Sequence, residues 1–172
     1  MPVSVLHFSD IHNNKVALRK VLSLSSQHKD HYVAITGDVC SLKSSFPAHE
    51  YDALRNPKVW LVRGNHDQVE TEQFSRLKKV TWQTPYFSTL SEKIAVLGLD
   101  SETDQIEPQL KQVNISVGAS RLKAIIVLHH RPYSAETKKQ VTFWVKKQFS
   151  GVVTLLLLHG HKHDDREFFS TI

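Results

Sequence analysis

The sequence predicts a layered α/β fold whose functional site lies beyond the carboxyl ends of its strands. Apolar runs of strand length repeatedly pass into polar loops and then into helical patterns, an order typical of layered α/β proteins. The middle of the chain changes to short strands joined by tight turns, which indicates an antiparallel stretch. Acidic, amide and imidazole side chains gather directly after several of the strands.

Strands and helices alternate in the first half of the chain. Residues 3–8 are rich in strand formers, and the apolar residues of 15–26 recur at helical spacing. Further apolar runs and weaker periodic patterns predict, in order, a strand at 32–36, a helix at 48–54, a strand at 58–62 and a helix at 69–77.

The second half begins with the antiparallel stretch. Its strands cover 80–82, 86–89 and 94–99, and a helix is expected near 107–113. A clearer helix at 135–149 carries its apolar residues on one face. The remaining strands are expected at 123–128, at 152–158 and, as a single last strand, within 164–172.

Length and composition indicate one globular domain covering residues 1–172. The hydrophobic share of 40% and the charged share of 23% are ordinary for such a domain. No apolar stretch reaches the roughly 18 to 20 residues of a membrane helix, so no membrane association is expected. Cys40 is the only cysteine, which excludes a disulfide within the chain and fits the cytoplasm, where we expect the protein. A strand is expected as early as residue 3, so we expect no removable presequence.

Five polar clusters spread along the chain carry the donors of one site. They are Asp10-Ile11-His12, Gly37-Asp38, Gly64-Asn65-His66-Asp67, His129-His130 and Gly160-His161-Lys162-His163. Their oxygen and imidazole donors suit Mn²⁺, Zn²⁺ or iron, and two such ions about 3.5 to 4 Å apart form a hydrolytic centre. Asp10 and His12 lie two residues apart, so an extended backbone would point both side chains the same way. The same argument applies to His161 and His163. The glycine before Asp38 allows a sharp turn that aims the carboxylate inward.

Taken singly, each cluster is typical of a polar loop, but in this order they resemble the blocks of the calcineurin-like metallophosphoesterase superfamily. Those blocks read D-x-H, G-D, G-N-H-D/E, a later H and G-H-x-H, and they match this chain between residues 10 and 163. The resemblance implies a four-layer β-sandwich of two mixed sheets flanked by helices. It also implies the ligands, which are Asp10, His12 and His163 for one ion, Asn65, His130 and His161 for the other, and Asp38 as the bridge.

The roles of the remaining polar residues follow from the same resemblance. The ligand histidine often stands two residues before a proline, which favours His130 because of Pro132, with His129 as the alternative. His66 would face the substrate, where it would stabilise the transition state or protonate the leaving alcohol. Asp67 would hold the imidazole of His66 in place, cap the following helix, or do both.

The implied activity is hydrolysis of a phosphate ester by a hydroxide that bridges two divalent metal ions, with Mn²⁺ expected and Zn²⁺ or iron as alternatives. Protein Ser/Thr phosphatases of the superfamily carry an arginine soon after the G-D block and another after G-N-H-E. Here Val39 follows Asp38 and Gln68 follows Asp67, so the chain looks more like the small bacterial-type phosphodiesterases. The expected substrate is a small phosphodiester or phosphomonoester, such as a nucleotide.

Two other functions compete with this one. The net charge of +5 and the lysine-rich helix at 135–149 favour anionic partners, and a basic face continuous with the site would indicate a nuclease acting on nucleic acid. A silent scaffold, like the retromer subunit with this fold, would be expected to lose ligands, whereas every position is filled here. Only nine residues follow His163, which indicates either a compact member or a fragment of a longer chain. The oligomeric state stays open.

Overall fold

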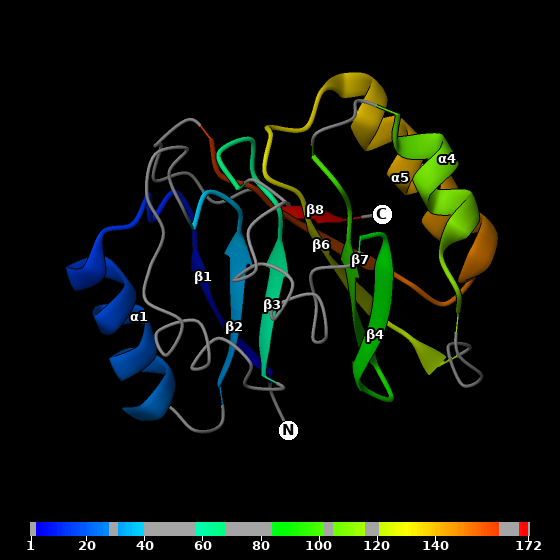
Figure 1. Ribbon diagram of the computed structural model, residues 1–172. Coiled ribbons are helices and arrows are strands. Elements are labelled where there is room, and N and C mark those ends of the chain that lie inside the picture. The colour runs from blue at the N-terminus through cyan, green and yellow to red at the C-terminus, as the bar shows by residue number, and fades with distance from the viewer. Residues whose placement is uncertain are drawn as a thin grey trace.

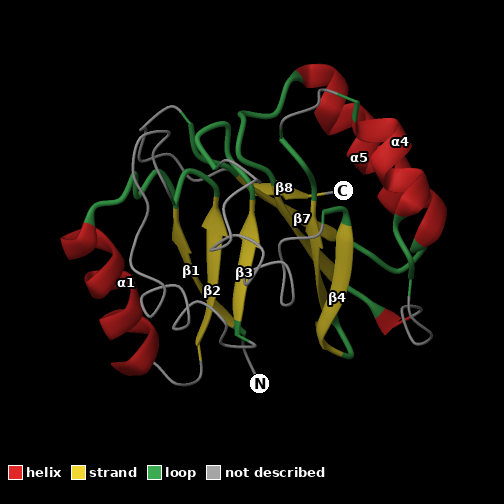
Figure 2. Cartoon of the chain, viewed as in Figure 1, coloured by secondary structure: helices red, strands yellow, loops and turns green. Residues whose placement is uncertain are grey.

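The computed structural model consists of two β-sheets packed face to face, with helices on both outer sides (Figure 1, Figure 2). The structure describes residues 3–27, 31–39, 58–67, 84–101, 105–115, 121–161 and 169–171. The helices predicted at 48–54 and 69–77, the strand predicted at 80–82, and His163 lie outside these residues.

The first sheet is a parallel array of three strands in the order β1-β2-β3. Its strands are β1 (Ser4–Phe8), β2 (His31–Thr36) and β3 (Val59–Val62). Helix α1 (Lys15–Gln27) covers the outer face, where its buried Leu18 and Val21 pack against Val33, Ile35 and Leu61. Parallel neighbours need a crossover of about a dozen residues or more, usually a helix, and α1 supplies it between β1 and β2.

The second sheet has five strands in the order β4-β5-β6-β7-β8. They are β4 (Tyr86–Ser91), β5 (Ile94–Gly98), β6 (Ala124–Leu128), β7 (Thr154–Leu158) and β8 (Phe169–Thr171). The three central strands are parallel, whereas β4 and β8 run antiparallel to their neighbours. The predicted antiparallel stretch is therefore confirmed for β4 and β5, as is the last strand. Within the described residues the three-stranded sheet is parallel throughout, so the expected mixture of strand directions holds for one sheet only.

Two helices cover the outer face of the second sheet, and an apolar layer joins the sheets. The helices are α4 (Ile106–Gln112), which confirms the helix expected near 107–113, and α5 (Ala135–Gln148). Trp60 and Val62 of the first sheet pack with Val96 and Ile126 of the second. The layers therefore follow the order α1, first sheet, second sheet, and α4 with α5 (Figure 1). This is the predicted four-layer sandwich.

The carboxyl ends of β1, β2 and β3 lie together at the top of Figure 1, where the loops that follow them gather. The segment after β6 joins them, because the His130 ring donates from Nδ1 to the carbonyl of Thr36 at 2.7 Å. The segment after β7 is bonded to the same place through Gly160, whose amide donates to the His130 carbonyl at 2.9 Å. The two sheets thus bring the described residues of the five clusters to one edge. In the part of the chain that the structure describes, no helix combines the length and apolarity needed to cross a bilayer.

Candidate metal centre

The loops after β1 and β2 are bonded to each other along their backbones. The amide of Asp10 donates to Gly37 O at 3.2 Å, and the amide of His12 donates to Asp38 O at 2.8 Å. Asp10, His12 and Asp38 have φ angles of 56°, 47° and 51°, so all three are in the left-handed region. The extended backbone predicted for the Asp10-His12 pair is therefore wrong. The two side chains still converge, with Asp10 Oδ1 3.8 Å from His12 Nε2, because the turn folds them together.

Asp38 stands at the centre of the site and is only 2% exposed. Its Oδ1 accepts a hydrogen bond from the His66 amide at 2.9 Å. Its Oδ2 lies 3.3 Å from His130 Nε2, 3.7 Å from His12 Nε2 and 4.0 Å from His66 Nε2. One carboxylate thus belongs to two groups of candidate metal donors, one with His12 and His66 and the other with His130 and His161. This is the placement that a bridging ligand needs.

The second group brings together oxygen and nitrogen atoms of three side chains beside Asp38. Because a carbonyl only accepts, the contact with Thr36 O puts a proton on Nδ1 of His130, and in the neutral ring Nε2 can then serve as a metal ligand. That Nε2 lies 3.1 Å from Asn65 Oδ1 and 3.2 Å from His161 Nδ1. His161 Nδ1 in turn lies 3.0 Å from Asn65 Oδ1. This set of oxygen and nitrogen donors suits a divalent metal ion.

Shifts of pKa at the same place agree with a site for positive charge. Burial raises the pKa of Asp38, but hydrogen bonds from the His130 side chain and the His66 amide outweigh it, so the net shift is downward. Burial lowers the pKa of His130, but its bonds to Asp38 and to the Thr36 carbonyl outweigh that effect and raise it. Asp38 is therefore ionised more readily than an ordinary aspartate.

The first group lies on the side of β1. His12 contributes Nε2 to it, and Asp10 directs Oδ1 toward the same nitrogen. The other oxygen of Asp10 accepts a hydrogen bond from the Ser9 hydroxyl and another from the His161 amide at 3.0 Å, so the Asp10 carboxylate is held from two sides. His163, the third ligand expected here, lies outside the described residues. We call Asp10, His12 and Asp38, with the predicted His163, the first metal position, and Asp38 with Asn65, His130 and His161 the second.

His66 and Asp67 occupy different surroundings. The His66 side chain is 36% exposed, and its ring meets the His12 ring edge-on with centroids 4.9 Å apart. Asp67 is fully buried and accepts a hydrogen bond from the Gly64 amide at 2.9 Å, which closes the loop that carries Asn65. The role of Asp67 toward the His66 imidazole stays a prediction. The helix that Asp67 was expected to cap lies outside the described residues.

The two adjacent histidines after β6 direct their rings to different partners. His130 faces Asp38 and Asn65, as described above, whereas His129 directs Nδ1 to the Arg131 carbonyl at 2.6 Å. The His129 ring packs beside Tyr133, with centroids 5.3 Å apart. Burial lowers the pKa of His129 to about 4, so it is neutral at physiological pH. The geometry therefore supports His130 as the ligand of the pair.

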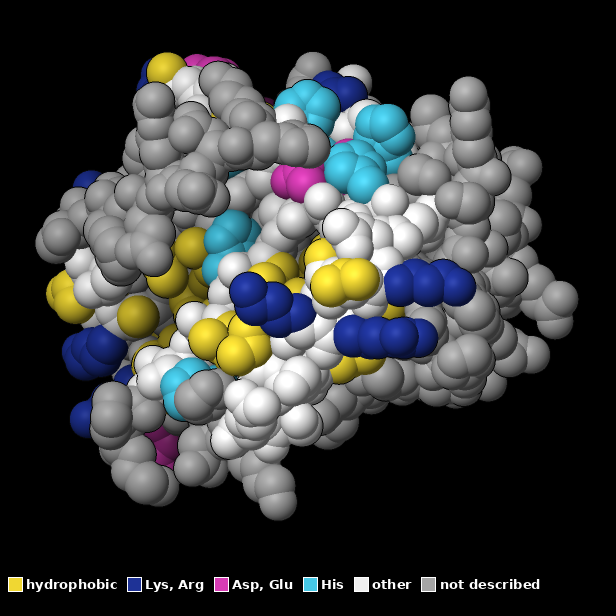
Figure 3. Space-filling view, turned by 90° about the vertical axis from the view of Figure 1, so that its left-hand side faces the viewer, with side chains coloured by type: hydrophobic (Ala, Val, Ile, Leu, Met, Phe, Trp, Pro, Cys, Tyr) yellow, Lys and Arg dark blue, Asp and Glu magenta, His cyan; other side chains and the backbone are white. Residues whose placement is uncertain are grey.

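The site is open to solvent on one side. Figure 3 shows several histidine side chains grouped beside an acidic one near the upper edge of the face that it presents. His161 is exposed and His12 is 28% exposed, whereas Asp38 and His130 are buried beneath them. A ligand could therefore reach the donors from the surface while the buried residues hold the geometry.

Sequence reasoning missed four residues that support these donors. They are Ser9, Arg63, Ser101 and Gln109. One signal was available, because Asp100 and Ser101 follow the apolar run of β5 as the other clusters follow theirs. Gln109 offered no such signal, since its partner is nine residues away on another element.

A further prediction concerns Gly64, which touches the backbone of the Asp38 loop. A Cβ at this position would overlap the Asp38 carboxylate and lie 2.5 Å from the Asp38 amide nitrogen. Gly64→Ala should therefore lower the free energy of unfolding by about 1–3 kcal/mol, the usual cost of overpacking. Urea denaturation of the two proteins measures this difference. An unchanged midpoint would mean that the loop can move away without cost.

Comparison with known proteins identifies the family. The sequence model of the calcineurin-like phosphoesterases matches residues 3–165. The chain therefore belongs to the calcineurin-like phosphoesterase family, which supports metal-dependent hydrolysis of phosphate esters in general terms. This confirms the resemblance carried by the five clusters.

Two solved structures are similar to this one. The first is YfcE, a phosphoesterase from E. coli, with 22% identity and a TM-score of 0.42 over 73% of this chain and 76% of that chain. The second is the calcineurin-like phosphoesterase YfkN from Bacillus subtilis, with 14% identity and a TM-score of 0.42 over 94% of this chain and 72% of that chain. No curated protein matches the chain. The family assignment rests on the family match.

Proposed function

We propose that the protein hydrolyses a small phosphate ester with the help of two divalent metal ions. The observation that carries this proposal is the position of Asp38, one buried carboxylate shared by two groups of imidazole donors. Asp10, His12, Asp38 and the predicted His163 would hold one ion. Asp38, Asn65, His130 and His161 would hold the other. When bound, the ions would supply a nucleophile at neutral pH and neutralise charge on the phosphate.

The chain's own residues would do the rest. His66 lies at the exposed side of Asp38, from where its imidazole can reach a substrate that enters from solvent. We assign it the delivery of a proton to the leaving oxygen, and we assign Asp67 the support of the loop that carries it. Asp38 and His130 are buried, so these two ligands would be held in place and partly sheltered from water. Little reorganisation of the site would then be needed during the reaction.

The finer points of the proposal come from the donor chemistry and the composition. Mn²⁺ fits a mixture of carboxylate, amide and imidazole ligands without thiolate, and we propose it as the metal, with Zn²⁺ or iron as alternatives. A small phosphodiester, such as a nucleotide derivative, is the proposed substrate. The proposed location is the cytoplasm, where the only cysteine, Cys40, would stay reduced.

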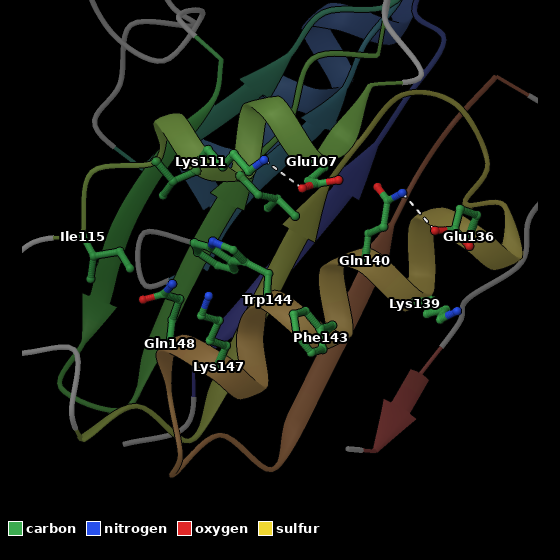
Figure 4. Close-up of a pocket in the computed structure, with 12 residues that line it drawn as sticks. Glu107, Lys111, Ile115, Glu136, Lys139, Gln140, Phe143, Trp144, Lys147 and Gln148 are labelled. Atoms are coloured by element: carbon green, nitrogen blue, oxygen red, sulfur yellow. Dashed lines mark hydrogen bonds and ion pairs between the residues drawn. The ribbon is translucent and has the colours of Figure 1, made fainter.

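A nuclease of the same chemistry finds less support. The lysine-rich helix that suggested this alternative, α5, lies on the outer face of the second sheet. Its Lys139 and Lys147 line a groove of about 680 Å³ against α4, shown in Figure 4, together with Trp144 and Phe143. The groove is lined by α4, α5 and the residues after α4, and none of the five polar clusters contributes to it. The two α5 lysines that line this groove therefore do not extend a basic face into the site.

The test is the dependence of hydrolysis on metal. Protein stripped of metal should leave bis-p-nitrophenyl phosphate and p-nitrophenyl phosphate intact, and added Mn²⁺ should restore release of p-nitrophenol. We expect the diester to react faster than the monoester. Metal-loaded, folded protein that cleaves neither ester would contradict the proposal and favour the scaffold, and a faster monoester would make the protein a phosphatase.

A further inference from the structure

We propose that the junction between β5 and α4 is a positioning device for the second metal position and not for the first. The device consists of Asp100 and Ser101, which follow β5, and Gln109 of α4. None of these three residues belongs to a cluster that supplies metal donors. The inference rests on the function proposed above, because it concerns how this chain holds one of the two ions.

Ser101 fixes the backbone of His130. The amide of His130 donates to the Ser101 hydroxyl oxygen at 2.5 Å, and Ser101 is only 2% exposed. The ring of the same histidine donates to the carbonyl of Thr36 at 2.7 Å. His130 is thus held at its amide by the second sheet and at its ring by the first. Its Nε2 has little freedom to move relative to Asp38.

Asp100 extends the same junction to the loop that carries Asn65. Its Oδ2 accepts a hydrogen bond from Arg63 Nη2 at 3.0 Å, and both side chains are largely buried. Arg63 stands two residues before Asn65, which supplies another donor of the second position. The junction therefore touches the supports of two donors that come from different sheets.

Gln109 holds the junction itself in place. Its side-chain oxygen accepts from the Asp100 amide at 2.6 Å, and its side-chain nitrogen donates to the Asp100 carbonyl at 2.9 Å. These two bonds pair the backbone amide and carbonyl of Asp100, as hydrogen bonds to a neighbouring strand would. Gln109 is 6% exposed, so water cannot easily replace the bonds if the side chain is removed.

The first metal position has different supports. The backbone amides of Asp10 and His12 donate to Gly37 and Asp38, and the Asp10 carboxylate accepts from Ser9. These bonds lie within the loops after β1 and β2 of the first sheet, and the further bond to the Asp10 carboxylate comes from the His161 amide after β7, not from the β5–α4 junction. Disturbing the β5–α4 junction should therefore weaken the binding of the ion at the second metal position and leave the ion at the first position bound.

The test compares Mn²⁺ binding to the full chain and to the variants Ser101→Ala and Gln109→Met. Calorimetric titration should show two ions bound by the unaltered protein, and one of them should bind about 10- to 100-fold more weakly in each variant, the usual effect of losing a bond that supports a ligand. Electron paramagnetic resonance should change from the spectrum of a coupled Mn²⁺ pair to that of an isolated ion. This second readout does not depend on activity.

The controls are matched by residue type. Ser134→Ala removes the hydroxyl that caps α5, where it accepts from the Thr137 amide, and Gln140→Met removes a side-chain bond to Glu136. Both should keep two tightly bound ions even though Ser134→Ala loses stability of about 1 kcal/mol. Equal weakening of both ions, or unchanged binding in both test variants, would overturn the inference and leave the proposed function standing. An unaltered protein that binds no Mn²⁺ would overturn both.

Discussion

Asp38→Asn should lower the rate of bis-p-nitrophenyl phosphate hydrolysis by about 10³-fold or more, because it removes the negative charge that both metal positions share. Asparagine keeps the shape of the side chain and is among the residues that tolerate the left-handed backbone at this position, where φ is 51°. The fold should therefore survive. Steady-state kinetics should be paired with a measurement of bound Mn²⁺, which should fall from two ions to one or none.

A carboxylate elsewhere serves as the control for Asp38. Glu107→Gln removes an equal charge from the exposed face of α4, where Glu107 pairs with Lys111 at 2.8 Å. That variant should keep full activity and both ions. If Asp38→Asn kept most of its activity while its metal content stayed at two, Asp38 would not be the bridge, and the shared position of its carboxylate would have another purpose.

His66→Asn should lower kcat by about 10²- to 10⁴-fold on substrates with poor leaving groups, because a general acid contributes that much to such reactions. The loss should be much smaller for p-nitrophenyl esters, since p-nitrophenolate leaves without a proton. A series of aryl and alkyl esters measures this dependence. The slope of log kcat against the pKa of the leaving alcohol should become steeper in the variant, while two Mn²⁺ ions stay bound.

The alternative role of His66 makes a different prediction. Its Nε2 lies 4.0 Å from Asp38 Oδ2, and His12, Asp38 and His66 together form one of the two donor groups. If His66 were a ligand, the variant would lose an ion and its activity would fall equally for every leaving group. His31→Asn, at the start of β2 and away from the carboxyl ends of the strands, is the matched control and should change neither quantity.

The gathering of the candidate donors could be predicted from the sequence because strand direction carries the information. In parallel strands the carboxyl ends lie at the same edge of their sheet, so the polar residues that follow β2 and β3 must come near one another, as must those that follow β6 and β7. The assignment of strands to two separate sheets is harder to predict. Strands such as Val59–Val62 and Ala124–Leu128 are both short and apolar, and nothing in their residues says which neighbour each one takes.

The backbone conformation of the loops and the hydrogen bonds that support the donors could not be predicted from the sequence either. The extended backbone expected for Asp10 and His12 failed because the loops after β1 and β2 bond to each other, which is a contact between segments far apart in the chain. Ser101 and Gln109 act through the backbones of His130 and Asp100. Bonds of this kind depend on the folded arrangement of several elements, so neither residue type nor spacing reveals them.

The left-handed residues place a second demand on the site. Outside glycine, the positions with positive φ are Asp10, His12, Asn13, Asp38 and His161 among the residues that the structure describes. Aspartate, asparagine and histidine are the side chains most often found in that conformation, and a β-branched residue there is a rare outlier. A replacement at Asp10, His12, Asp38 or His161 must therefore both supply a metal ligand and tolerate a left-handed backbone. The backbone conformation alone therefore limits these positions to a few residue types, apart from any requirement of catalysis.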